Sequence, residues 1–170
     1  MDLQLRNKVV IVTGASEGIG RAAAERFSQE GALVALAART QNDLDNVAND
    51  IASTSGNAVI GIATDVRKEE SVKALIEAVV KKGGKIDVLV NNAGTSSASR
   101  LEELTNEQVD EDFNLKVKGA IFCTRHALPY LKKSRGCICN TTTPGGKAPT
   151  AGTQPTALSR AAGISLTKTW

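Results

Sequence analysis

The chain has 170 residues, which is enough for one domain with its own hydrophobic core. Apolar residues make up 41% of it and aromatic residues only 3%, so the core must be aliphatic, as suits helices packed on a parallel sheet. The net charge of +3 is small and gives no basis for a nucleic-acid partner. No stretch has the ~20 apolar residues of a membrane helix, and the first ten residues lack a signal-peptide pattern.

Short apolar runs alternate with helical patterns along the chain. Runs that fit strands buried on both faces lie at residues 8–13, 32–37, 58–63, 86–91 and 136–142. Apolar residues at helical spacing lie between them, at 19–30, 44–51 and 72–80. A longer helix begins at a capping box of Thr105 and Gln108 and extends to about Lys132, with a kink or early stop at Pro129. A last helix begins near Pro155, and the alternation predicts an α/β fold with a parallel sheet and right-handed crossovers.

The cysteines and the single histidine suggest no metal or disulfide chemistry. Cys123, Cys137 and Cys139 include no CxxC motif, and the last two stand too close on one strand for a relaxed disulfide. We therefore expect reduced, buried thiols and a reducing, cytoplasmic compartment. The sequence has no cluster of metal-ligand residues, and His126 is expected to be a packing or helix-interface residue.

A glycine-rich stretch, TGASEGIG, follows the first predicted strand and opens a helix. Its glycines, Gly14, Gly18 and Gly20, have the spacing G-x-x-x-G-x-G. Glycines permit a tight turn and let the backbone approach a pyrophosphate, and the helix N-terminus offers free N–H groups and a partial positive charge. The stretch therefore predicts a dinucleotide site, and the alternative is a glycine-rich turn without a ligand.

The end of the second predicted strand favours NADP over NAD. An NAD site usually has an acidic residue here that accepts the ribose hydroxyls, whereas this chain has Ala38 and Arg39. An arginine can pair with the 2′-phosphate of NADP. Glu17 argues against NADP because its carboxylate would lie near the same phosphate and repel it. The alternative for Arg39 is a solvated charge at the entry of a helix.

Several motifs together resemble the short-chain dehydrogenase/reductase family over essentially the whole chain. They are TGASEGIG, DV at 65–66, NNAG at 91–94, KGAIFCTRHALP and GCICNTT. The resemblance implies a Rossmann-type, doubly wound fold in three layers, with NAD(P) at the carboxyl ends of the strands. It implies that Asp65 holds the adenine amino group beside Val66. It further implies contacts to the adenosine and to the phosphate and nicotinamide end, from Asn92, Ala93, Gly94, Ser16 and Ile19.

The resemblance also implies hydride transfer between the nicotinamide and a carbonyl or an alcohol. In the family a serine polarises the carbonyl, a tyrosine gives the proton, a lysine lowers the pKa of that tyrosine, and an asparagine completes a proton relay. The motifs place these four roles on Thr143, Thr156, Arg160 and Lys116, so all four are substituted. Thr143 keeps a hydroxyl. Thr156 is shorter than a tyrosine and a far weaker acid, and Arg160 stays protonated.

Lys116, rather than Asn114, occupies the asparagine position because it precedes the VKG element. A lysine beside a nicotinamide cation and Arg160 would have a lowered pKa and could serve as the acid. The alternative is a lysine that extends to solvent or contacts a threonine hydroxyl. The single tyrosine, Tyr130, is expected at the surface or in packing, not as a displaced proton donor.

Family members typically continue past the last helix with a further strand, a substrate-covering segment and another strand, which this sequence lacks. We expect a single domain over residues 1–170, with five strands in the order 3-2-1-4-5 and one uncovered edge. Either a partner covers this edge or the chain is part of a longer protein. In the family the last two long helices pack against symmetry mates, so we expect a homodimer or homotetramer.

The sequence therefore predicts an NADP-dependent oxidoreductase with a small carbonyl or alcohol substrate. The alternative is a catalytically inactive NADP(H)-binding protein that acts as a sensor or an oligomeric scaffold, which the substitution of all four catalytic positions favours. A nucleotide-sugar epimerase is disfavoured because such proteins normally keep the tyrosine–lysine pair.

Overall fold

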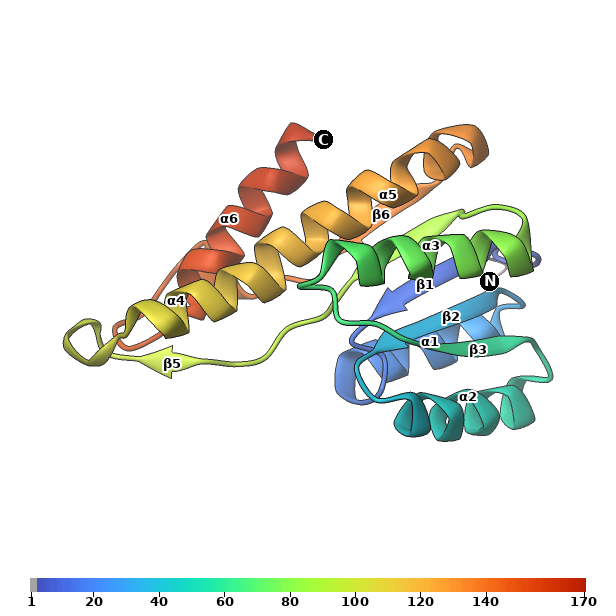
Figure 1. Cartoon of the computed structure of the whole chain (residues 1–170), viewed down its shortest axis with the longest axis horizontal. Coiled ribbons are helices and arrows are strands. Elements are labelled where there is room, and N and C mark those ends of the chain that lie inside the picture. Colours follow the sequence, from blue (N-terminus) through green and yellow to red (C-terminus); the bar gives the residue numbers. More distant parts are fainter. Residues whose placement is uncertain (1–2) are drawn as a thin grey trace.

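The fold is built on a parallel sheet whose strands are the predicted apolar runs (Figure 1). The computed structural model describes residues 3–170, so residues 1 and 2 of the predicted domain lie outside the described residues. All pairings in the sheet are parallel, and the strand order is β3-β2-β1-β4-β6. This confirms the predicted order of five strands. Their bounds are β1 (Val9–Thr13), β2 (Leu33–Ala38), β3 (Val59–Ala63), β4 (Val88–Asn91) and β6 (Cys137–Asn140).

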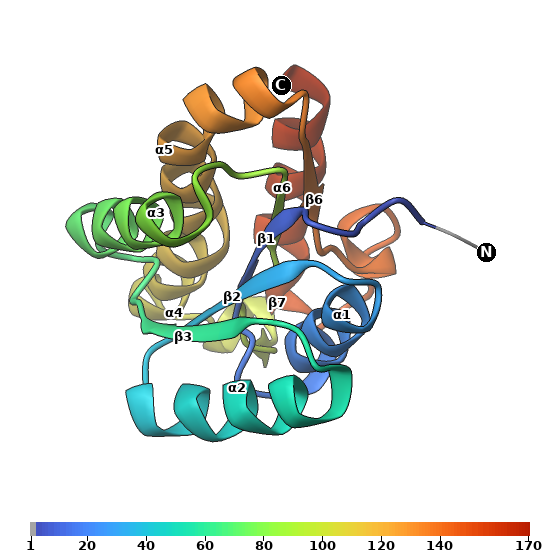
Figure 2. The ribbon, with the colours of Figure 1, turned by 90° about the vertical axis from the view of Figure 1, so that its right-hand side faces the viewer.

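Helices cover both faces of the sheet, which gives the three layers of a doubly wound fold (Figure 2). On one face α1 (Gly18–Gln29) and α2 (Gln41–Ser55) pack against strand residues such as Val10. On the other face α3 (Glu69–Gly83) and α5 (Gly119–Ser134) pack against strand residues such as Ile11. Successive strand residues point to opposite faces, so β1 and β2 each contribute to both halves of the core.

One long helix runs through α4 (Asn106–Phe113), a π-helical turn at Asn114–Lys118, and α5 (Figure 1). It begins at the predicted capping box, in which Gln108 N donates to Thr105 Oγ1 at 3.3 Å and Thr105 N donates to Gln108 Oε1 at 3.0 Å. Pro129 lies inside α5 without ending it. The expected early stop does not occur, because α5 continues past Pro129 to Ser134.

A smaller two-stranded sheet lies at the end of the molecule remote from α2 (Figure 1). In it β5 (Ala98–Ser99) pairs antiparallel with β7 (Gln154–Pro155). Two short turns of 3-10 helix complete the chain, η1 (Leu101–Glu103) before α4 and η3 (Pro144–Gly146) after β6. The last helix, α6 (Thr156–Thr169), packs against η3 and against the π-helical turn. The residues after β6 are thereby brought beside the middle of the long helix.

The three cysteines are free, but only one is buried. Burial raises the pKa of the Cys123 thiol to about 12, so it is an unreactive packing group. Cys137 and Cys139 are exposed, and the expectation that they are buried is wrong. The reason is their strand: β6 is an edge strand in the part of the chain that the structure describes, so its side chains are less covered than those of β1 or β4.

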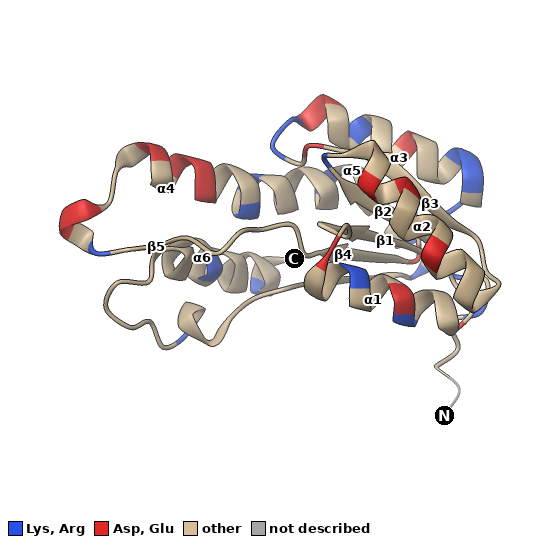
Figure 3. Ribbon diagram, turned by 90° about the horizontal axis from the view of Figure 1, so that it is seen from below, with Lys and Arg blue, Asp and Glu red and all other residues tan. Residues whose placement is uncertain are grey.

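Charged residues of both signs are interspersed over the helices (Figure 3). The charged residues of α3 complement the helix dipole, with Glu69 and Glu70 in its first turn and Lys81 and Lys82 in its last. Within residues 3–170, no helix combines the length and the apolar character needed to cross a bilayer.

Candidate functional site

The glycine loop between β1 and α1 disfavours a side chain at each of its three glycines, through the backbone conformation or through close neighbours. Gly14 adopts a φ of +64° and Gly18 a φ of +56°, which L side chains rarely adopt. A methyl group on Gly20 would overlap the carbonyl oxygen of Gly14 and lie 2.5 Å from Asn92 Nδ2. The side chain of Glu17, the N-cap residue of α1, makes no capping hydrogen bond, which leaves N–H groups of the first turn for a ligand. This cradle fits the pyrophosphate of a dinucleotide.

The ends of β1 and β4 are fastened to one another behind this loop. Thr13 Oγ1 accepts hydrogen bonds from the backbone N–H groups of Asn92 and Ala93, both at 3.0 Å. Asn92 Nδ2 donates to the carbonyl oxygens of Thr13 at 3.0 Å and Gly14 at 3.1 Å. The Asn92 side chain therefore holds the glycine loop in place. Adjacent strands whose crossovers run in opposite directions leave a crevice at this edge, where ligands bind in doubly wound folds.

Asp65, at the end of β3, is already engaged by a neighbour. Arg67 donates from Nε to Asp65 Oδ1 and from Nη2 to Oδ2, both at 2.9 Å. These hydrogen bonds hold the pKa of Asp65 below its usual range. Val66 is buried against Gly119, where a methyl group would lie 2.9 Å from Val66 Cγ2. Arg67 was not among the predicted site residues, although an arginine two residues after an aspartate can reach it.

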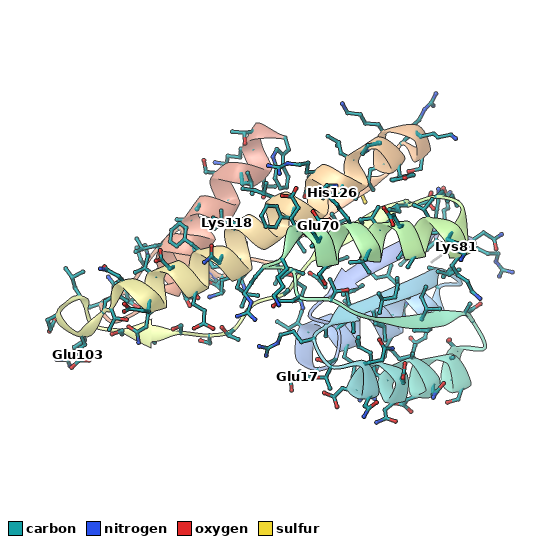
Figure 4. The ribbon with its side chains drawn as sticks, viewed as in Figure 1. Glu17, Glu70, Lys81, Glu103, Lys118 and His126 are labelled. Atoms are coloured by element: carbon teal, nitrogen blue, oxygen red, sulfur yellow. The ribbon has the colours of Figure 1, made fainter. Side chains whose placement is uncertain are left out.

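The remaining predicted cofactor residues follow β1 and β2 and are exposed or half-buried. Glu17 and Ile19, at the start of α1, are exposed, and Ser16 is half-buried (Figure 4). Arg39 follows β2 and is exposed. Within residues 3–170 no carboxylate pairs with the Arg39 guanidinium, so it is available to an anionic group.

Two of the four residues predicted to be catalytic are in direct contact. Lys116 Nζ, from the π-helical turn, donates to Thr156 Oγ1 at 2.9 Å. Lys116 Nζ also forms an ion pair with Asp112 Oδ1. Both side chains of this pair are buried, with exposed fractions of 1% and 2%. Lys116 therefore does not extend to solvent, and the threonine contact that was the alternative is present.

Electrostatics at Lys116 are set by burial and by two charges. Burial lowers the pKa of the Lys116 ammonium, Asp112 opposes this by stabilising the charge, and Arg160 lowers the pKa further. The aspartate was missed in the sequence because the spacing from 112 to 116 is that of an ordinary solvated ion pair on a helix surface. Here α6 covers that helix face.

Arg160 lies one turn after Thr156 on α6, and its side chain lies near that of Lys116 beside Gly94. A methyl group on Gly94 would lie 2.8 Å from Arg160 Nη2 and 3.3 Å from Lys116 Cε, so both side chains meet at that glycine. Arg160 Nη1 donates to the carbonyl oxygen of Thr141. Its Nε is buried and has no partner within residues 3–170. Burial lowers the pKa of this guanidinium, and Asp112 partly opposes the effect.

Thr143 is the predicted site residue that stands apart. It precedes η3, and no hydrogen bond within residues 3–170 links its side chain to Lys116, Thr156 or Arg160.

His126 Nε2 lies 2.8 Å from Glu69 Oε1 and joins α5 to α3, so its predicted helix-interface role is confirmed. Tyr130 packs at the margin of the core. Within residues 3–170, no three His, Cys, Asp or Glu side chains gather as a metal site would require.

One pocket lies between the strand ends and the residues around Lys116. It is lined by Thr13 and Ala93 at the strand ends behind the glycine loop, and by Lys116 and Arg160. A doubly wound sheet with a glycine cradle at its crevice defines a dinucleotide-binding α/β domain. The sequence model of the short chain dehydrogenases matches residues 8–170, and the chain belongs to this family of NAD(P)-binding oxidoreductases.

Relatives match nearly the whole chain. Meso-2,3-butanediol dehydrogenase of Serratia marcescens is 36% identical over 166 residues, which are 98% of this chain and 65% of that protein. The 3-oxoacyl-[acyl-carrier-protein] reductase of Thermotoga maritima is 36% identical over 169 residues, 99% of this chain and 68% of that protein. L-sorbose reductase from Gluconobacter frateurii, solved with NADPH and L-sorbose, superposes with a TM-score of 0.95 at 33% identity, covering 99% of this chain and 65% of that one. The chain thus spans about two thirds of the length of these relatives.

Proposed function

We propose that this chain binds NADP(H) and carries out hydride transfer between it and a small carbonyl or alcohol substrate. The observation that carries the proposal is the shared pocket. The strand ends beside the glycine cradle line the same space as two cations, the buried Lys116 and the half-buried Arg160. A carbonyl oxygen that gains negative charge during reduction is stabilised by cations fixed in a site of low dielectric.

Each half of the site has a defined task. Gly14, Gly18 and Gly20 would admit the pyrophosphate, and Arg39 would pair with the 2′-phosphate. When bound, the cofactor supplies or accepts the hydride at its nicotinamide. The chain itself must orient the substrate, exclude water and move one proton. The Asp65 carboxylate, which already accepts two hydrogen bonds from Arg67, would contact the adenine.

The substrate class is supported by the relatives and by the pocket. A butanediol dehydrogenase and a sorbose reductase are, by their names, enzymes of small hydroxylated molecules. Two positively charged side chains, Lys116 and Arg160, face one carboxylate, that of Asp112. The resulting excess of positive charge suits an oxygen-rich substrate.

The alternative is a protein that binds NADP(H) without turnover. It is favoured by one observation, the ion pair with which Asp112 already balances Lys116.

We also propose a homodimer or homotetramer in a cytoplasmic, reducing compartment. Leu128 on α5 and Leu158 on α6 are exposed apolar side chains on the two helices expected to face a partner. The exposed thiols of Cys137 and Cys139 suit a reducing environment. Sedimentation velocity of the chain and of Leu158→Glu tests the oligomer, which the variant should dissociate if α6 lies in the interface.

Two measurements on the same protein test the proposed function. Fluorescence titration with NADPH and NADH gives the affinities, and NADPH oxidation is then followed with a panel of aldehydes, diketones and ketoses. Binding of NADPH together with oxidation by at least one panel member supports the oxidoreductase. Tight NADPH binding without oxidation across the panel supports the inactive alternative, and no binding of either cofactor overturns both.

A further inference from the structure

We propose that Lys116 and Thr156 form a proton relay to the substrate oxygen, and that Asp112 positions Lys116 for this task. The inference rests on the proposed function, because a relay has a role only if hydride transfer occurs. It assigns the proton-donating work to two substituted positions acting together. Neither of them resembles the tyrosine that the family uses.

The hydrogen bonds of Thr156 leave its hydroxyl proton free in one direction. Thr156 Oγ1 accepts from Lys116 Nζ at 2.9 Å and from the backbone N–H of Ser97 at 3.1 Å. A hydroxyl oxygen has two lone pairs and one proton, so both lone pairs are in use. The Thr156 hydroxyl donates no hydrogen bond within residues 3–170. Its proton is therefore free to be donated to a group that binds beside it.

This arrangement answers the objection that threonine is too weak an acid. Thr156 need not become an alkoxide, because a proton can arrive from Lys116 as its own proton leaves. In the direction of reduction, the Thr156 O–H bond breaks as a new O–H bond forms on the substrate oxygen. A Lys116 N–H bond breaks as the threonine hydroxyl is restored, and Lys116 is left as a neutral amine. Solvent then returns one proton to Lys116, so one proton and one hydride have been added to the carbonyl.

The charges around Lys116 suit a proton donor. The charged groups that face it are Asp112 from α4 and Arg160 from α6. Burial and Arg160 lower the pKa of Lys116, which makes its ammonium a better acid than a solvated lysine. Asp112 acts in the opposite direction and keeps the ammonium at Thr156 by its ion pair. Asp112 touches Lys116 and not the substrate, so it is a positioning residue.

The first test uses variants that keep the fold. Thr156→Val preserves the volume and both charges, and it removes only the hydroxyl. We expect its rate of NADPH oxidation to fall about 100-fold or more, the usual contribution of a positioned proton donor, with unchanged NADPH affinity. Thr156→Ser restores the hydroxyl and should restore most of the rate. Lys118→Met is the matched control for Lys116→Met, because Lys118 is an exposed lysine of the same π-helical turn (Figure 4).

The second test needs no turnover. In the chain without cofactor, NMR of 13Cε-labelled lysine follows the titration of Lys116, identified by its loss in Lys116→Met. We expect Asp112→Asn to move this titration to lower pH, because the carboxylate that stabilises the ammonium is gone. The falling limb of the rate against pH should move by the same amount. Asp112→Asn thus shifts the profile, whereas a purely structural aspartate would lower the rate at every pH.

The outcomes separate this inference from the proposed function. A wild-type chain that binds NADPH and oxidises none with the whole panel overturns the proposed function, and the relay with it. A wild-type chain that turns over, with Thr156→Val equally active, overturns the relay alone. A rate profile that stays in place while the lysine titration moves also overturns the relay, because Lys116 would then not supply the proton.

Discussion

Lys116 Nζ lies 2.9 Å from Thr156 Oγ1, and this hydrogen bond joins the π-helical turn to the first residue of α6. The two residues are 40 positions apart in the chain. The long side chain of Lys116 thus reaches the short side chain of Thr156, and the two residues form a polar contact at the predicted site.

The buried ion pair of Asp112 and Lys116 should contribute to the stability of the fold. Asp112→Ala would leave the Lys116 ammonium buried without its carboxylate, and removing one partner of such a pair costs about 3–5 kcal/mol. The double variant Asp112→Leu with Lys116→Met replaces both charges by apolar groups and should cost less than the single one. Urea unfolding of the three proteins measures the difference. Equal losses in the single and double variants would mean that the ion pair is not buried in solution.

Much of the fold was predictable because it depends on patterns that are local in sequence. The β-branched run at β1 and the glycines after it determine a buried strand and a tight turn, whatever the rest of the chain does. The same holds for the capping box at Thr105, which needs only a residue three positions later.

The sequence predicts which residues could form the site, but it does not predict the contacts among them. Motif spacing identified Lys116 and Thr156, whereas their hydrogen bond depends on how α6 lies across the π-helical turn. Asp112 was missed because its partner, four residues on, predicts a surface ion pair until a second helix covers it. The exposure of Cys139 likewise depends on β6 being an edge strand, which no spacing within the strand reveals.

Gly20 should be the most sensitive position for dinucleotide binding. Gly20→Ala places a methyl group against the Gly14 carbonyl and 2.5 Å from Asn92 Nδ2, so the glycine loop must move away from β4. We expect NADPH binding to fall below detection in a fluorescence titration. Gly56→Ala is the control for the loss of a glycine as such, because no heavy atom lies within 4 Å of its added methyl group, although Gly56, unlike Gly20, has a positive φ, of +70°. Gly56→Ala should cost only backbone strain at the end of α2. Normal NADPH binding by Gly20→Ala would contradict the proposal that the glycine loop holds the pyrophosphate.

Asp87 should dominate the acid limb of stability. Its carboxylate is 5% exposed and accepts from Val9 N at 2.8 Å, Lys85 Nζ at 2.9 Å and Lys8 Nζ at 3.3 Å. Burial alone would raise the pKa of Asp87, but these donors outweigh it and hold the pKa below the usual value.

Because the folded pKa is the lower one, this stabilisation is complete above the unfolded pKa of about 3.9 and is lost as the pH falls through the folded pKa. Asp87→Asn should lower the free energy of unfolding at pH 7 by about 1.5–3 kcal/mol, the contribution of hydrogen bonds to a charged group. Its stability should also depend less on pH in the acid range than that of the wild type. Thermal unfolding from pH 2 to 7 measures both effects, with Glu77→Gln, an exposed residue of α3, as the control. Parallel acid limbs in wild type and Asp87→Asn would assign the pH dependence to other carboxylates.

Arg39 should decide the choice between the two cofactors. Its exposed guanidinium follows β2, where the ribose of a bound dinucleotide would lie, and it has no carboxylate partner within residues 3–170. Arg39→Ala removes a charged hydrogen bond to the 2′-phosphate worth about 1.5–3 kcal/mol, so the Kd for NADPH should rise roughly 10- to 100-fold while that for NADH changes little. Arg26→Ala is the control, because Arg26 is an exposed arginine of α1 that pairs with Glu30 in its last turn. Glu17→Gln should act in the opposite direction and tighten NADPH binding, since it removes a negative charge beside the same phosphate. An unchanged ratio of the two Kd values in Arg39→Ala would show that the preference, if there is one, is set elsewhere in the glycine loop.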